Sequence, residues 1–101
     1  MEKVFKALAD ATRRRLLDRL LETPGLTLSE LVAGLGMTRQ SATRHLAVLE
    51  DAGLLVTVWR GREKRHYVNP VPITDIGDRW IDKFADAEQD ATDALNKALD
   101  D

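Results

Sequence analysis

The sequence has 101 residues, of which 44% are hydrophobic, a length and composition typical of one compact domain with a modest core. It has no cysteine, no apolar run near the roughly 18 residues that cross a bilayer, and no signal-peptide pattern at its start, so we expect a cytoplasmic protein without disulfides, thiol chemistry or membrane contact. The net charge of −2 does not exclude a nucleic-acid partner, because residues 1–66 hold 12 Lys and Arg against 8 Asp and Glu, whereas residues 67–101 hold 3 against 9.

Two helices are predicted in the first 25 residues. The first runs from Glu2 to Ala9 and carries three apolar side chains on one side: Val4, Phe5 and Leu8. Asp10 is a favourable N-cap for the second helix, which ends at Thr23-Pro24-Gly25. Its wide apolar stripe is formed by Leu16, Leu17, Leu20 and Leu21. We interpret the run Arg13 to Arg15 as solvated charge with an ion pair to a neighbouring helix, rather than as direct phosphate contacts.

A helix-turn-helix is predicted at about residues 27–53. Thr27 and Glu30 form a capping box that starts its first helix, in which the apolar stripe is made by Leu28, Leu31 and Val32. The short break Leu35-Gly36-Met37 separates it from a second helix, about Thr38 to Ala52, which we call the recognition helix. Its inner stripe is Ala42, Leu46 and Leu49, and Gly53 is a natural C-terminal stop.

The outer face of the recognition helix carries side chains suited to duplex DNA. At 100° per residue, Gln40 and Arg44 lie opposite the apolar stripe, flanked by Ser41 and Ala47. Arginine can bond guanine O6 and N7, and glutamine can bond adenine N6 and N7, so both can distinguish bases in a major groove. We expect the surrounding polar residues to bond phosphate oxygens: Thr38, Arg39, Thr43 and His45.

A β-hairpin, the wing, is predicted at about residues 54–69. Leu54 to Trp59 and Arg65 to Val68 have strand character, and the turn between them is charged. Its basic side chains, Arg60, Arg62 and Lys64, lie beside the recognition helix, so we expect them to contact the DNA backbone or minor groove. The alternative is that they only keep a hairpin soluble. We interpret Trp59 and Tyr67 as packing residues.

A long amphipathic helix is predicted at about residues 73–99, after Pro70 and Pro72. Its apolar stripe begins with Ile73, Ile76, Trp80, Ile81 and Phe84 and continues as Ala87, Ala91, Ala94, Leu95 and Ala98. The stripe is long for a small domain, so we predict that it pairs with the same helix of a second copy and also packs against Val4, Phe5 and Leu8. The alternative is that it folds back entirely on its own domain.

The chain resembles the ArsR/SmtB family of bacterial winged helix-turn-helix repressors along nearly its whole length. The resemblance rests on the element order and on four segments: Asp10 to Arg15, Gln40 to Leu46, Leu49 to Leu54 and Gly61 to Tyr67. It implies a mainly α fold with a small β-hairpin and a homodimer joined through the first and last helices. It also implies binding to an inverted repeat in double-stranded DNA, with contacts from Thr38, Gln40, Ser41, Thr43, Arg44, His45 and Arg62.

The sequence departs from the metal-sensing members that it resembles. Where many relatives have paired cysteines in the third helix, this chain has Ser29 to Ala33, and its last helix has Asp75, Asp78 and Asp82 but no histidine. Carboxylates alone are poor zinc ligands, so we expect no metal site, no cofactor and no inducer identifiable from the sequence. His45 and His66 are interpreted as polar-contact or packing residues.

Two other functional classes were weighed against a DNA-binding repressor. A protein-interaction module could use the winged-helix surface for a protein partner, which the acidic last helix and the negative net charge favour. An enzyme has little support, because the sequence offers no cysteine, only two histidines and no glycine-rich phosphate loop before a helix.

Overall fold

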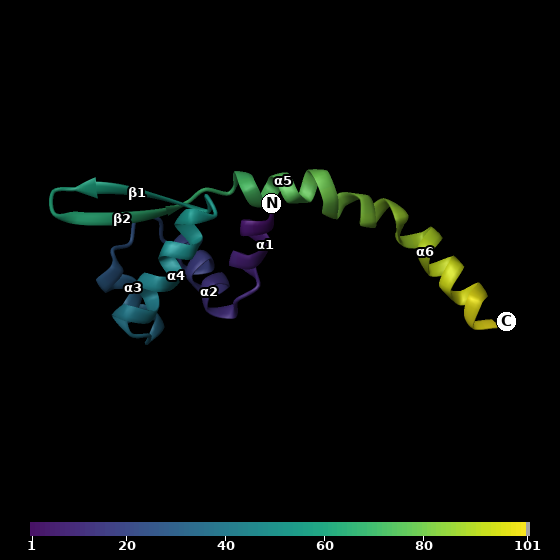
Figure 1. The fold of residues 1–101 in the computed structure, drawn as a ribbon, viewed down its shortest axis with the longest axis horizontal. Coiled ribbons are helices and arrows are strands. Elements are labelled where there is room, and N and C mark those ends of the chain that lie inside the picture. The colour runs from purple at the N-terminus through teal and green to yellow at the C-terminus, as the bar shows by residue number, and fades with distance from the viewer. Residues whose placement is uncertain (101) are drawn as a thin grey trace.

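A computed structural model describes residues 1–100 and contains six α-helices, one π-helical segment and a two-stranded antiparallel sheet (Figure 1). The elements in chain order are α1 (Glu2–Leu8), α2 (Ala11–Glu22), α3 (Leu28–Leu35), α4 (Arg39–Asp51), β1 (Leu55–Arg60), β2 (Glu63–Val68), α5 (Val71–Ile76), η1 (Gly77–Ile81) and α6 (Asp82–Asp100). The predicted fold class, mainly α with a winged helix-turn-helix, is confirmed. The molecule is elongated, with extents of 65 × 25 × 23 Å, because α6 extends away from the other helices.

The junction between α1 and α2 is held by side chains at both helix ends. The Asp10 carboxylate accepts hydrogen bonds from the backbone N–H groups of Thr12 and Arg13, at 2.8 and 3.2 Å. These hydrogen bonds to the charged carboxylate hold the pKa of Asp10 below its usual value, and the bond from the Arg13 N–H contributes more than the bond from the Thr12 N–H.

The arginines at the start of α2 bond to backbone carbonyl oxygens of α1, whereas an ion pair to a neighbouring helix was predicted. The Arg13 guanidinium donates to the carbonyl oxygens of Lys6 and Ala7, both at 2.8 Å, and Arg14 donates to that of Leu8 at 2.6 Å. These carbonyls form the C-terminal end of α1, where cations oppose the negative end of the helix dipole. The carboxylate nearest to Arg13 is that of Asp10, 3.9 Å away on the same helix.

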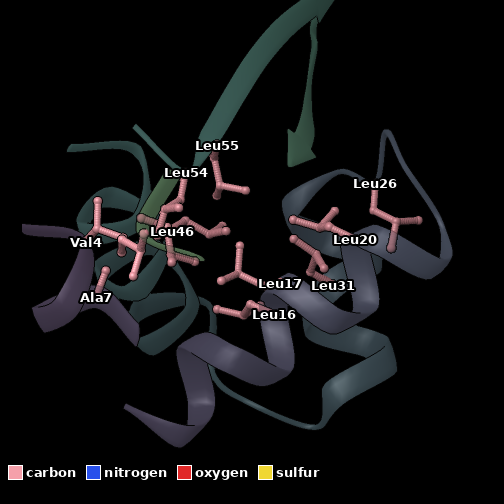
Figure 2. Close-up of a cluster of buried hydrophobic side chains, with 12 residues drawn as sticks. Val4, Ala7, Leu16, Leu17, Leu20, Leu26, Leu31, Leu46, Leu54 and Leu55 are labelled. Carbon is pink, nitrogen blue, oxygen red and sulfur yellow. The ribbon is translucent and has the colours of Figure 1, made fainter. Parts of the chain in front are cut away.

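The core lies between α1, α2, α3, α4 and the start of the wing, where aliphatic side chains point toward one another (Figure 2). The largest completely buried side chains are Leu16, Leu20, Leu31, Leu49 and Leu54. Leu21 was predicted to be part of this apolar stripe, and that prediction is wrong, since 61% of its surface is exposed. Leu21 is one residue beyond Leu20, and this one-residue step rotates its side chain by about 100° about the helix axis, away from the core-facing line.

Leu16 and Leu21 provide a matched pair for testing this core. We expect Leu16→Ala to lower the free energy of unfolding by about 2–5 kcal/mol, because it removes a fully buried side chain and leaves a cavity. Leu21→Ala, on the same helix, should change it by no more than about 0.5 kcal/mol. Urea unfolding followed by circular dichroism measures both values. Equal losses in the two variants would contradict the core described here.

The helix-turn-helix forms as the sequence predicts. Thr27 Oγ1 accepts from the Glu30 N–H at 3.3 Å, and the Glu30 carboxylate accepts from the Thr27 N–H at 3.1 Å, which completes the capping box. These bonds from Thr27 hold the pKa of Glu30 below its usual value. Gly36 ends α3 with a φ of 64°, a left-handed conformation that glycine adopts without strain, and the chain then turns into α4.

The wing lies within its predicted bounds, but its two strands extend further toward the tip and its turn is tighter than predicted. Leu55 pairs with Val68 at one end of the hairpin and Arg60 with Glu63 at the other, so only Gly61 and Arg62 make the turn. On β2, His66 is buried, and its ring Nδ1 lies 2.9 Å from the Leu26 carbonyl oxygen. His66 is therefore a polar packing residue, as predicted. Tyr67 is half-buried, with its hydroxyl group over Gly25.

The predicted last helix is divided into α5, η1 and α6, and two residues assigned to its dimer surface are covered by their own chain. Val4 and Ile76 are 7% and 3% exposed and belong to the monomer core, so their assignment to a dimer interface is wrong. The cause is that α1 lies against η1 of the same chain, where the Phe5 and Trp80 rings meet edge to face with their centroids 5.8 Å apart. Phe5, Leu8 and Ile73 are half-buried against this core.

Candidate nucleic-acid interface

The N-terminal half of α4 presents a polar surface to solvent, opposite the buried stripe of Ala42, Leu46 and Leu49. Four exposed side chains on this surface surround a shallow hollow of about 510 Å³: Arg39, Gln40, Thr43 and Arg44. A hydrogen-bonded side chain fixes the start of the helix, since Thr38 Oγ1 accepts from the Ser41 N–H at 3.1 Å. The hydroxyl proton of Thr38 can still be donated to an outside acceptor.

Three of the predicted contact residues are engaged within the protein. The Arg39 guanidinium donates to Ser29 Oγ at 2.8 Å, and Ser41 is half-buried. His45 is also half-buried, with its Nδ1 3.4 Å from Arg13 Nη1 on α2. The polar surface of α4 is thus centred on Gln40 and Arg44, whereas Ser41 and His45 lie toward its junction with the core.

The basic residues of the wing have unequal surroundings. The Lys64 ammonium lies 3.5 Å from the Glu50 carboxylate at the end of α4, so an internal ion pair holds this side chain. Arg60 and Arg62 are exposed, and within residues 1–100 neither has a carboxylate partner. The two arginines therefore have guanidinium groups available to an external anion.

A groove of about 600 Å³ lies between α4, the start of α3 and the wing. Its lining includes Arg39 and Thr43 from α4, Trp59 and Arg62 from the wing, and Ser29 from α3. Trp59 was predicted to be a packing residue, and that prediction is wrong, since 65% of its surface is exposed. Four of the predicted site residues thus border a common groove that the sequence alone does not reveal: Arg39 and Thr43 from the recognition helix and Arg62 and Lys64 from the wing.

Alternation along β1 was a signal for the position of Trp59. Leu55, Thr57 and Trp59 share one face of the strand, and their exposure increases from buried to half-buried to exposed. The face was predictable from this spacing of two. What the spacing does not give is how far the hairpin extends past the helices (Figure 1). Trp59 lies in the outer part of β1, where its side chain is exposed.

The part of the chain that the structure describes offers neither a cluster of metal ligands nor a membrane-spanning helix. No group of three or more His, Cys, Asp or Glu side chains is arranged to hold a metal ion among residues 1–100. In the same range, no helix is both long and apolar enough to span a bilayer.

Comparisons with known proteins agree with this geometry. A family model described as a helix-turn-helix domain matches residues 8–58. The chain is 40% identical over 87 residues to the uncharacterized HTH-type transcriptional regulator YuzN of Bacillus subtilis strain 168, covering 80% of this chain and 95% of that protein. It is 30% identical over 97 residues to the arsenical resistance operon repressor of Escherichia coli K12, covering 96% and 82%. The solved ArsR-like transcriptional regulator from Rhodococcus sp. RHA1 superposes with a TM-score of 0.79 at 26% identity, covering 98% and 89%.

Proposed function

We propose, on the premise that this chain belongs to the ArsR/SmtB family of winged helix-turn-helix transcriptional regulators, that it is a homodimeric repressor of its own or a neighbouring operon. Regulators of this family bind DNA, which supports duplex DNA as the partner of this chain. The proposal adds the residues that make the contacts, an inverted-repeat operator and a place of action in the cytoplasm. The observation that carries it is the exposed polar surface of α4, with Gln40 and Arg44 at its centre.

The proposed contacts divide into two kinds. Gln40 and Arg44 contact base edges in the major groove, because their side chains can each make two hydrogen bonds to a purine. Thr38, Arg39 and Thr43 bond phosphates beside the recognition helix, and Arg60 and Arg62 bond the backbone beyond it. Ser41, His45 and Lys64 act mainly by positioning these elements, since each is partly covered or paired within the chain.

The proposed dimer surface lies on η1 and α6. Trp80, Ile81 and Phe84 are 44%, 53% and 55% exposed, and Leu95 and Leu99 extend the apolar surface along α6. At 100° per residue, Phe84, Ala91 and Leu95 fall within an arc of about 40°, and most charged residues of α6 lie away from this arc, with the exception of Glu88 at its edge. An apolar stripe this long on one chain supports pairing with the same stripe of a second copy.

Arg62 provides the test of the proposed DNA contacts. We expect Arg62→Ala to weaken binding to all duplex sequences alike and to reduce the slope of log K against log salt by about 1.8 for the dimer, because each of the two protomers loses one phosphate contact with a value of about 0.9. Arg79→Ala is the matched control, because Arg79 lies on η1 and pairs with Asp75 at 2.9 Å. Fluorescence anisotropy with labelled duplexes at several salt concentrations gives both slopes. An unchanged slope for Arg62→Ala would remove Arg62 from the DNA interface.

A protein-interaction module is a second candidate, favoured by the exposure of the acidic helix α6. On that hypothesis the winged-helix surface holds a protein partner, and duplex DNA of any sequence gives no anisotropy change at moderate salt. The same titration series therefore distinguishes the two candidates. Catalysis is not proposed, because the family consists of transcriptional regulators.

A further inference from the structure

Trp59 is a large aromatic side chain that is exposed on the inner face of the wing. It lies on the same face of the hairpin as Leu55 and the buried His66, and it pairs across the sheet with Lys64. This face is turned toward α4, and the side chains of Trp59, Lys64 and His66 line the groove between the two elements. The indole ring therefore borders the groove from the wing side, with 65% of the residue's surface exposed.

The groove has an excess of positive charge once its internal ion pairs are counted. Its two carboxylates are both paired, Glu50 with Lys64 at 3.5 Å and Glu63 with Arg65 at 3.4 Å. Arg39 and Arg62 remain, and among residues 1–100 neither has a carboxylate within ion-pair distance. Arg39 is oriented at the α3 end of the groove by its hydrogen bond to Ser29.

One kind of polymer fits a groove whose lining includes an exposed aromatic ring and two cations without carboxylate partners. A nucleic-acid strand alternates anionic phosphates with apolar sugar faces, and aromatic side chains and arginines are the groups that bind these two parts. The groove also lies beside Gln40 and Arg44, so a strand that leaves the recognition helix toward the wing must cross it.

We propose that this groove holds one sugar-phosphate strand of the bound duplex, with the Trp59 indole packed against a deoxyribose and Arg39 and Arg62 bonding the adjacent phosphates. The inference rests on the proposed function, since it assumes that α4 and the wing face the same DNA. Trp59 is thereby assigned to DNA binding. The groove makes an apolar contact with the strand through Trp59, in addition to the electrostatic contacts of Arg39 and Arg62.

Tryptophan fluorescence tests the contact directly, because the chain has only two tryptophans. In a Trp80→Phe protein, Trp59 is the sole emitter. We expect duplex DNA to shift or quench its emission and to reduce its quenching by acrylamide several-fold. The complementary Trp59→Phe protein, in which Trp80 is the sole emitter, is the control for changes elsewhere in the protein. If Trp80→Phe weakens the fold, the emission of Trp59 is obtained instead by subtracting the spectrum of Trp59→Phe from that of the wild-type protein.

Affinity measurements separate the proposed apolar contact from a charged one. We expect Trp59→Ala to weaken duplex binding about tenfold through the loss of buried apolar surface, with the salt slope unchanged. Trp59→Phe should recover most of the loss. Val58→Ala is the matched control, since Val58 lies on the outer face of the same strand and should leave the affinity as it was.

Two results would overturn the inference in distinguishable ways. Duplex binding with unaltered Trp59 emission and acrylamide quenching would show that the strand does not occupy the groove, and would leave the proposed function standing. The absence of any duplex binding by the wild-type protein would overturn the proposed function and this inference together.

Discussion

Phe84→Asp is expected to convert the protein to a monomer and to weaken binding to an inverted-repeat operator by about 10²- to 10⁴-fold. The loss has this size because a dimer binds its second half-site as an intramolecular event, whereas a monomer gains nothing from the second half-site. The Phe84 and Trp80 rings meet edge to face with their centroids 5.0 Å apart, and Phe84 is 55% exposed. The aspartate therefore places a charge in the middle of the apolar stripe without opening the monomer core. Sedimentation equilibrium gives the stoichiometry, and anisotropy gives the affinity.

Two variants control for the added charge and the lost ring. Gln89→Asp adds the same charge to the same helix, but on its polar side about 140° from Phe84, and should remain dimeric. Phe84→Leu keeps an apolar side chain and should also remain dimeric. If Phe84→Asp sedimented as a dimer and bound the operator with wild-type affinity, the second copy would not be held by α6.

Arg44→Ala is expected to relax sequence preference at one base pair in each half-site, with a loss of about 1–3 kcal/mol in discrimination. An arginine that bonds guanine O6 and N7 supplies discrimination of this size, and alanine supplies none. Arg44 is exposed on α4 and has no internal hydrogen bond or ion pair among residues 1–100, so its removal should leave the fold unchanged. Competition between operators substituted at single positions measures the effect.

The comparison variants for this prediction are Arg44→Lys and Arg62→Ala. Lysine keeps the charge but not the planar two-donor fork, so it should retain affinity for DNA in general and lose most of the discrimination. Arg62→Ala should weaken all sequences by the same factor. A uniform loss for Arg44→Ala would mean that this residue bonds phosphate, and the base-reading surface would then have to lie elsewhere on α4.

The sequence was sufficient to predict the parts of the fold that depend on local chemistry. The Thr27–Glu30 capping box, the Asp10 N-cap and the turn at Gly36 each follow from a side-chain or backbone preference acting within a few residues. Exposure of Gln40 and Arg44 followed in the same way from the spacing of the buried stripe on α4. Their role in base contact stays a prediction.

The failed predictions concern which part of the molecule covers an apolar side chain. Helical spacing placed Val4 and Ile76 correctly on apolar faces, but it does not distinguish a face covered by the same chain from one left for a partner. Trp59 is the opposite case, because its position on the inward-facing side of the strand suggested a packed side chain. The hairpin extends beyond the core (Figure 1), and Trp59 is exposed. Both outcomes depend on the relative placement of distant segments, which periodicity within one element does not contain.

The central claim is that two copies of α4 contact DNA through Gln40 and Arg44, and selection of bound duplexes from a random pool tests it most directly. We expect enrichment of an inverted repeat whose half-site centres lie about 34–36 Å apart, one turn of the duplex. The same selection with the Gln40→Ala, Arg44→Ala double variant should lose the preferred bases within the half-sites. Enrichment of a single unrepeated site, or of the same sequence by both proteins, would contradict the claim.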